Sequence, residues 1–527
     1  AFISPLFLRC AEGRRLLTYL FGLHPGLLDD IHSVIRQQLP GTRKTVLKAY
    51  GEIYMRAWRG AEGVYLEKIE STCLQDIMYA CIHASSPRLH ASLLTVLGSA
   101  HAQKSQRGVD AMLHRLYGPV LWRALRVANP TVRAQACQVL VDAFPLQDPA
   151  AGPEVTDKVL QQQFEALRLL LEDDHPPVRA VAAQGVCRIL SVYWELIPLD
   201  TTKALLQRVL GYSAFDAASP AVRLGAVSGL TVLLDCPLSH SVLKAMLRNV
   251  GNLLHDNNRR VRLAFVGLLQ RVKSLRAIKF YHVVPVDHLL ARLGEDHTKY
   301  PAVATALSKL LLNSYFPTGP DSSGARQLSR AVTLLSQSRA AATAFYTRLH
   351  ALAGVESAAK MLALLAQCVS LAMDEEDEEG GGGGGGQEDD AEQAQAVSAG
   401  GKKGGAEEGV DMPRGRKTAG GGGGTLSASD PEMMSGLLVL MCCLWDSAAD
   451  ALSSPTNLPS LELVQESITG DLLARLHRRY KGHPAPRAAF MRLAGLAGPA
   501  LAPGMLEEVV GEMLALPEAS LEARASD

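Results

Sequence analysis

The chain has 527 residues, 47% of them apolar and only 5% aromatic, and its nine cysteines include no CxxC spacing. This composition favours helices over strands and excludes a disulfide-stapled secreted scaffold. The net charge of zero conceals a segregation, because residues 1–373 carry 41 Lys and Arg against 27 Asp and Glu, whereas residues 374–527 carry 12 against 26. The basic part suits a polyanionic partner.

The ends and the apolar runs indicate a non-membrane protein. No signal peptide is evident, and the longest apolar run, Leu437–Trp445, is shorter than the roughly 18 residues that a membrane span needs. The first residue is Ala1 rather than Met, so we expect an incomplete N-terminus.

A short motif recurs along the chain: a polar stretch, often with a proline, then Val-Arg, then an apolar helical pattern. Clear copies are Asn129–Arg133, Asp174–Arg179, Ser219–Arg223 and Asn258–Arg262, with arginines 46, 44 and 39 residues apart. This period is typical of HEAT/armadillo helix pairs, which bury their apolar faces only by stacking on neighbours. We therefore predict an all-α HEAT/armadillo-type solenoid over residues 1–373.

The recurring arginines have two alternative roles, a structural ladder or nucleic-acid binding. We favour the ladder, because packing explains their fixed place in every repeat. In such repeats the arginine usually pairs with an acidic side chain in the inter-helix turn or the next repeat. The predicted ladder residues are Arg133, Arg179, Arg223, Arg262, Asp174, Asp216 and Asp256.

Residues 374–430 break the pattern. They begin with the acidic run Asp374–Glu379 and contain the glycine runs Gly380–Gly386 and Gly420–Gly424. Such a stretch buries too little apolar area to offset its ordering entropy, so we predict a disordered acidic, Gly-rich linker that interrupts the solenoid. Helical periodicity resumes in residues 431–527, which we expect to form further, degenerate HEAT-like helices.

A basic cluster lies at the fourth clear repeat, where Asp256 is the only acid between residues 248 and 279. The spacing of three between Lys273, Arg276 and Lys279 predicts that they share one side of a helix. With Arg259 and Arg260 they form a candidate stripe for a phosphate backbone. The alternative is an ordinary solvated face.

A second basic signal lies in the predicted linker. Residues Arg414, Gly415, Arg416 and Lys417 follow a proline and are similar to an AT-hook core, which enters the minor groove of A·T-rich DNA. A nuclear-import segment and a chance match in a low-complexity tract are the alternatives.

Catalytic motifs are absent from the sequence. It contains no P-loop, HExxH, GxSxG or EF-hand pattern, and its glycine runs are homopolymeric. Cys73, Cys81 and His83 form at most a partial metal set, and we interpret the cysteines as core residues. We expect no enzyme activity, no cofactor and no metal.

Several longer stretches carry a more specific resemblance. Gly51–Trp58, Met112–Arg123, Val141–Pro145, Leu254–Asn257, Val261–Val266 and Val272–Phe280 resemble segments of the G-type HEAT subunit of condensin II. The similarity is colinear over most of residues 1–320 and weakens beyond, and the glycine-rich stretch looks peculiar to this chain.

The resemblance implies a scaffold role. A G-type subunit is expected to have no ATPase activity, to grip the kleisin subunit and to clamp double-stranded DNA with it. Through the complex it joins the pair of coiled-coil SMC ATPases and a second HEAT subunit, in mitotic chromosome condensation on chromosomes in the nucleus. The family protein is longer, so the chain is expected to lack an N-terminal portion and much of the C-terminal portion.

Two other scaffold functions are alternatives. A karyopherin-like transport adaptor is also a HEAT solenoid, but it needs an acidic inner surface, and residues 1–373 are basic. A regulatory scaffold of a signalling complex, for a phosphatase or kinase, is the third reading.

Overall fold

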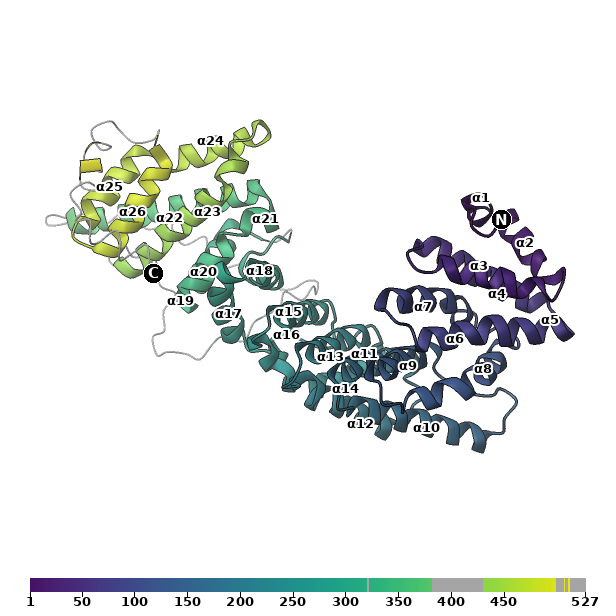
Figure 1. The fold of residues 1–527 in the computed structure, drawn as a ribbon. Coiled ribbons are helices and arrows are strands. Elements are labelled where there is room, and N and C mark those ends of the chain that lie inside the picture. The colour runs from purple at the N-terminus through teal and green to yellow at the C-terminus, as the bar shows by residue number, and fades with distance from the viewer. Residues whose placement is uncertain (320–321, 382–429, 499–506, 508–509, 512–527) are drawn as a thin grey trace, which may run out of the picture. The chain divides into compact units, whose positions relative to one another are not determined.

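A computed structural model describes residues 1–319, 322–381, 430–498, 507 and 510–511. All regular elements in these residues are helices, arranged as stacked antiparallel pairs, so the predicted all-α HEAT/armadillo-type solenoid is confirmed (Figure 1). The chain divides into two compact units, Ala1–Val283 and Val284–Asp527.

The first unit consists of two layers of helices. The first helices of the pairs are α3 (Leu27–Gln38), α5 (Gly63–Lys68), α6 (Gln75–Ile82), α8 (Val109–Ala124), α10 (Pro153–Leu171), α12 (Leu199–Gly211) and α14 (His240–Met246). The second helices are α4 (Lys44–Gly60), α7 (Pro87–His101), α9 (Pro130–Ala143), α11 (Pro176–Tyr193), α13 (Pro220–Leu233) and α15 (Arg259–Lys273). Helices α1 (Pro5–Arg9) and α2 (Ala11–Tyr19) precede these pairs, and α16 (Phe280–Val283) follows them. Each second helix packs against the second helix of the next pair.

Short polar residues begin the second helices. The side chains of Ser86, Asn129, Ser219 and Asn258 accept hydrogen bonds from backbone N–H groups of the first turns of α7, α9, α13 and α15. Proline follows the cap in α7, α9 and α13, where its missing N–H costs nothing. The recurring polar-Pro-Val-Arg motif is therefore the start of a second helix.

Small residues let the second helices approach closely. A Cβ atom at Gly225 of α13 would lie 2.6 Å from the carbonyl oxygen of Ala180 in α11. Since that neighbour is backbone, the position accepts only glycine without a shift of one helix.

The second unit is also built of packed helices. They are α17 (Val286–Lys299), α18 (Pro301–Tyr315), α19 (Gly324–Gln337), α20 (Arg339–Tyr346), α21 (Leu349–Ala353), α22 (Val355–Gly381), α23 (Pro431–Leu452), α24 (Leu458–Ser467), α25 (Gly470–Tyr480) and α26 (Pro484–Ala497). The long helix α23 packs against α20, α22 and α26 and is buried on most sides.

Two boundaries differ from the sequence interpretation. Helix α22 runs to Gly381, past the predicted linker start at residue 374, because glutamate is a good helix former and Asp374 is held by Arg475 at 2.6 Å. The helices that follow the linker join α17–α22 in one compact unit rather than a separate one. Residues 382–429, most of the predicted linker, lie outside the described residues.

Candidate nucleic-acid interface

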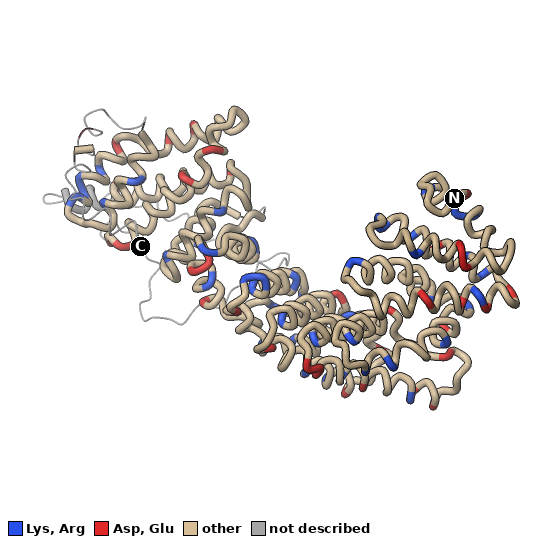
Figure 2. The backbone as a smooth tube through the Cα atoms, in the orientation of Figure 1, with Lys and Arg blue, Asp and Glu red and all other residues tan. Residues whose placement is uncertain are grey.

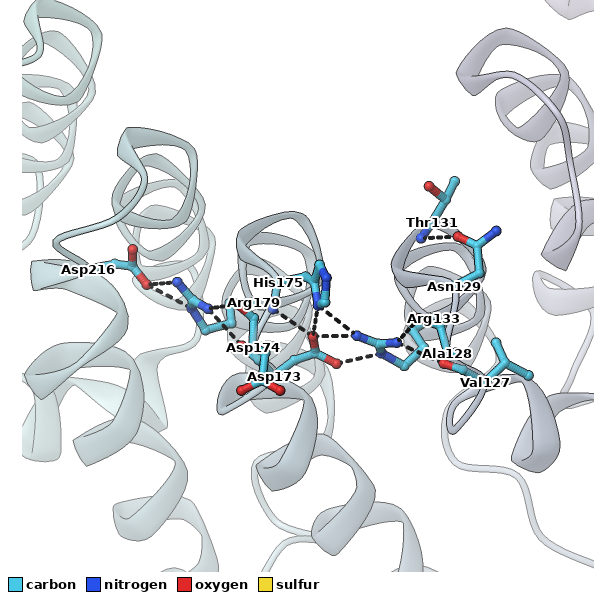
Figure 3. Close-up of polar contacts among 10 residues, drawn as sticks. All are labelled: Val127, Ala128, Asn129, Thr131, Arg133, Asp173, Asp174, His175, Arg179 and Asp216. Carbon is cyan, nitrogen blue, oxygen red and sulfur yellow. Dashed lines mark hydrogen bonds and ion pairs between the residues drawn. The ribbon is translucent and has the colours of Figure 1, made fainter.

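An arginine at the fourth position of α9 joins two neighbouring repeats (Figure 3). The Nε and Nη2 atoms of Arg133 donate to the carboxylate oxygens of Asp173, in the turn of the next repeat, at 2.7 and 2.8 Å. Its Nη1 atom donates to the carbonyl oxygens of Val127 and Ala128, both at 2.8 Å, in the turn of its own repeat. One guanidinium group thus ties two successive turns together.

The same arrangement recurs in the next two repeats. Arg179 Nε donates to Asp216 at 2.8 Å, and Arg223 donates to both carboxylate oxygens of Asp256 at 2.6 and 2.9 Å. The backbone carbonyl of Asp216 in turn accepts from Arg223 Nη1 at 2.7 Å, and that of Asp256 accepts from Arg262 at 2.6 Å. Each turn aspartate is therefore shared by two arginines. We call this chain of contacts the turn ladder.

The structure corrects one predicted ladder residue. The partner of Arg133 is Asp173, not Asp174, whose side chain is exposed and whose carbonyl oxygen accepts from Arg179 at 3.0 Å. Asp173 lies six residues before Arg179, the interval that also separates Asp256 from its own repeat's arginine. At this interval the Asp173 carboxylate faces the preceding repeat and also accepts from the His175 N–H at 2.9 Å.

Hydrogen bonds set the charge state of the ladder. Burial raises the pKa of Asp173, but the hydrogen bonds from Arg133 and from the His175 N–H outweigh burial, so the pKa is lowered overall. The pKa of Arg133 is raised, chiefly by its hydrogen bond to Asp173. Both groups stay charged and paired at neutral pH, so this arginine is not free to bind a phosphate.

The candidate DNA-binding residues split into two groups. Arg259 and Arg260 are the first two residues of α15, and Lys273 is its last. At 1.5 Å per residue the two ends lie about 20 Å apart. Arg259, Arg260 and Arg276 are exposed, whereas Lys273 and Lys279 are half-buried, and burial lowers the pKa of Lys273.

The prediction that Lys273, Arg276 and Lys279 share one helix side is wrong. Helix α15 ends at Lys273, and the other two lie in the segment between α15 and α16. Ser274 ends the helix, because its hydroxyl donates to the Arg271 carbonyl at 2.7 Å, and the buried Ile278 then turns the chain inward.

Acidic residues are distributed unequally between the two helix layers of the first unit. Helices α3, α8, α10 and α12 each begin with an acid in the first turn, whereas none of the six second helices does. Arg259 and Arg260 even occupy the positive end of the α15 dipole, where a cation costs about 0.3–1 kcal/mol. Cations placed against this cost indicate a surface that attracts anions.

Sequence reasoning missed a second group of cations around α4. Arg9, Arg43, Lys44, Lys48 and Arg88 are all exposed, and within the described residues none of their side chains forms a hydrogen bond or ion pair. The feature of the sequence that indicates this group of cations is the absence of any Asp or Glu from residues 31–51 and 77–109. Apart from this group and the basic cluster at residues 248–279, basic and acidic residues of the first unit are interspersed (Figure 2).

A shallow groove of about 320 Å³ crosses α11, α13 and the start of α15. Its walls are mostly small and apolar, including Val181, Ala221 and Leu224, and Arg260 lies on its rim. A segment of a partner chain fits such a groove better than a small molecule does, because the groove is open and does not enclose a ligand.

The remaining predicted sites give no chemical centre. The segment Arg414–Lys417 lies outside the described residues. Cys73 and Cys81 are fully buried, and burial raises the pKa of the Cys73 thiol to about 12, so it is a core residue and not a reactive group. In the described ranges no group of three His, Cys, Asp or Glu side chains is placed to hold a metal ion.

Two helices of the second unit are apolar over a longer stretch than the sequence analysis expected. Val355–Asp374 and α23 are long and apolar enough to cross a membrane, judged by length and composition alone. In α23 the apolar stretch extends beyond the run Leu437–Trp445 through Met433, Met434 and Gly436 before it and three alanines and Leu452 after it. Both helices pack against other helices of the unit, and about half of the apolar stretch of Val355–Asp374 and 67% of that of α23 are buried.

Comparison with known proteins identifies relatives of the chain. A family model described as condensin II non structural maintenance of chromosomes subunit matches residues 1–148. The condensin-2 complex subunit G2 of Mus musculus is 38% identical over 371 residues, which are 70% of this chain and 32% of the relative. The chain therefore spans about a third of the length of the curated relatives it matches.

Solved structures share the repeat architecture only distantly. The Pds5–Scc1 complex matches with a TM-score of 0.38 and 11% identity, over 99% of this chain and 79% of that one. Importin beta matches with a TM-score of 0.31 and 11% identity, over 88% and 57%. The specific information comes from the sequence comparison: the resemblance to the condensin II subunit is confirmed, and the chain is similar to condensin-2 complex subunit G2 over 70% of its own length.

Proposed function

We propose that this chain is a non-catalytic HEAT-repeat scaffold of condensin II, which binds the kleisin subunit and double-stranded DNA in mitotic chromosome condensation. The observation that carries the proposal is the 38% identity to subunit G2 over most of the chain. In this role the chain acts on chromosomes in the nucleus, and it joins the SMC ATPase pair and the second HEAT subunit through the kleisin.

The proposed DNA contacts are the cations that the turn ladder does not neutralise. Arg259 and Arg260, at the start of α15, are exposed, and so is Arg276, which lies with the half-buried Lys273 and Lys279 at and beyond the other end of the helix. Contacts of this kind go to phosphate oxygens, so they fix position and affinity without reading sequence.

The salt dependence of DNA binding tests this proposal. The chain, purified with its kleisin partner, would be titrated into a labelled duplex of about 40 base pairs between 50 and 200 mM salt. Five phosphate contacts predict a log–log slope of about −4.5, and Arg259→Glu with Arg260→Glu should make the slope shallower by about 2. A flat salt response, or a double variant that binds as the native chain does, overturns the DNA part.

A matched control uses two exposed lysines of the first-helix layer. Lys158→Glu with Lys203→Glu changes the charge by the same amount on α10 and α12. We expect this control to retain most of the DNA affinity, since only long-range attraction is reduced.

For the kleisin we propose the groove across α11, α13 and α15. Leu224→Glu places a carboxylate on the groove wall and should weaken kleisin binding at least about tenfold, with little change in DNA binding by the free chain. Retained kleisin binding would assign that partner to another surface. Co-purification also separates the alternatives, because a transport adaptor would bring a small GTPase and a signalling scaffold would bring a phosphatase or kinase subunit.

A further inference from the structure

Two grooves lie on either side of α4, in the N-terminal part of the first unit. One, of about 600 Å³, lies between α1–α2 and α4, and the other, of about 570 Å³, lies between α4 and α7. Lys48 and Glu52 line both grooves, so only the exposed ridge of α4 separates them. The two neighbouring hollows are lined by α1, α2, α4 and α7, and we call them the α4 grooves.

The rim of the α4 grooves is cationic. Arg9 and Arg43 line the first groove, Lys44 lines the second, and Lys48 lines both. All are exposed and, within the described part of the chain, make no ion pair. The one acid in either lining, Glu52, is neutralised by Arg14 at 2.8 Å and Arg56 at 2.6 Å.

Apolar residues also line the α4 grooves, and in the second groove they alternate with Thr95, Ser99 and Gln103. Leu8, Val46 and Ala49 line the first groove, and Leu94 and Gly98 line the second. A Cβ atom built at Gly98 meets nothing within 4 Å, so the second groove has free room directly above α7. Duplex DNA is bound mainly through phosphate and sugar oxygens, and apolar residues of a groove contribute nothing to such contacts.

We propose that the α4 grooves are a docking site for a linear acidic peptide of a protein partner. Its Asp and Glu carboxylates pair with the rim cations, and its apolar side chains contact the apolar residues of the lining, as in other grooves that read alternate side chains of a peptide. The inference rests on the grooves alone and holds whether or not the function proposed above does.

The test uses the full chain and a labelled peptide of about 14 residues composed of Glu, Leu, Ser and Gly. Fluorescence anisotropy should detect binding, and replacing every Leu of the peptide by Ser should weaken it at least about fivefold. Lys44→Glu with Lys48→Glu should weaken it at least about tenfold. Gly98→Leu should also weaken it about fivefold, because the new side chain fills the second groove without changing any charge.

Controls separate this inference from a fold defect and from DNA binding. Lys158→Glu with Lys203→Glu should bind the peptide as the native chain does, and circular dichroism melting should show Gly98→Leu to be folded. Unchanged binding by a folded Gly98→Leu variant, or equal binding of the Leu and Ser peptides, overturns the proposal and leaves only a charged surface. The Lys44→Glu, Lys48→Glu variant is also titrated with duplex DNA. If it loses as much affinity for the duplex as for the peptide, and Gly98→Leu binds both as the native chain does, the surface is a DNA contact and the peptide proposal is overturned.

Discussion

The repeats around α9–α15 and those around α4–α7 share one architecture but use arginine in opposite ways. In the former, Arg133, Arg179 and Arg223 each grip an aspartate of the next turn and are largely shielded from water. In the latter, the corresponding fourth helix positions hold Leu47 and His90, and no aspartate stands in the turns. The Nδ1 atom of His90 lies 2.8 Å from the carbonyl oxygen and 3.5 Å from the Sγ atom of Cys81, in the preceding helix of its own repeat.

This difference teaches how the free cations of a solenoid are recognised. An arginine is part of the framework where the next turn offers a carboxylate, and it remains available to a partner where that carboxylate is missing. Arg43, directly before α4, and Arg88, the second residue of α7, follow turns without acids and are exposed and unpaired in the described chain. Whether the turns carry acidic residues, more than how many arginines are present, therefore distinguishes arginines that hold the repeats together from arginines that can bind a partner.

The largest expected effect comes from cutting the ladder. Asp173→Ala leaves the partly buried Arg133 without its carboxylate, which should lower the free energy of unfolding by about 2–3 kcal/mol. The matched control is the neighbouring exposed Asp174→Ala, which should change it by at most about 0.5 kcal/mol. Chemical denaturation of both variants measures the difference, and equal losses would show that the ladder is not a framework.

A pH experiment contrasts the two regions next. Burial lowers the pKa of His101, on α7, from 6.5 to about 4. As the pH falls, His101 is therefore protonated in the unfolded chain before it is protonated in the folded chain. The contribution of the neutral, buried His101 to stability is complete above about pH 6.5 and is lost as the pH falls toward 4. The full pKa shift of His101 corresponds to a loss of about 3 kcal/mol in the free energy of unfolding. Because the side chain is partly accessible to water, we expect a loss of about 2 kcal/mol.

Two variants isolate this titration. His101→Gln should flatten the stability profile between pH 6.5 and 4, because it removes the group that titrates. The lowered pKa of Asp173 has its effect at lower pH, below the usual carboxyl range. Asp173→Asn should therefore lower the stability throughout the neutral range and change the slope of the profile only at its acid end. An unchanged profile in His101→Gln would assign the acid sensitivity to another group.

Two glycines give a smaller, opposite pair of effects. Gly225→Ala pushes a methyl group against the Ala180 carbonyl and should destabilise the ladder region by about 1–2 kcal/mol. Gly98→Ala, in the open second α4 groove, should stabilise by about 0.5–1 kcal/mol, since alanine is the better helix former. Thermal melting measures both, and the same sign for both would contradict the difference in packing.

The smallest expected effect is on the free cations themselves. Arg43→Ala and Arg88→Ala should each change the free energy of unfolding by less than about 0.5 kcal/mol, because neither side chain has a partner to lose within the described residues. Denaturation alongside Asp173→Ala provides the comparison. A loss near 2 kcal/mol would place these arginines in the framework after all.

Much of the fold follows from the sequence, because its signals are local. The polar cap, the proline and the apolar period each act within one helix turn, so the starts of α9, α11, α13 and α15 were predictable. The end of α15 was not, since Ser274 and the burial of Ile278 stop the helix through contacts that a spacing of three does not contain.

The binding surfaces were less predictable, because they depend on which groups meet across repeats. Asp173 and Asp174 are equivalent in the sequence, and only the register of the turn decides which one reaches Arg133. The cations of the α4 grooves come from α1, α4 and the turn before it, and the structure brings them to one surface. The absence of acids over residues 31–51 was the one available clue.

The turn ladder also affects how the first unit can bend. Toward the far ends of the second helices, both partners of the ion pair Arg271–Asp235 are exposed, and in the pair Arg188–Asp142 the arginine is exposed. Ion pairs that water reaches contribute only about 0–1 kcal/mol each. Neighbouring repeats are thus held together more strongly at their turns than at the far ends of their second helices. A change of curvature therefore costs the least free energy when neighbouring repeats separate at the far ends of the second helices, while the distance between successive turns stays fixed.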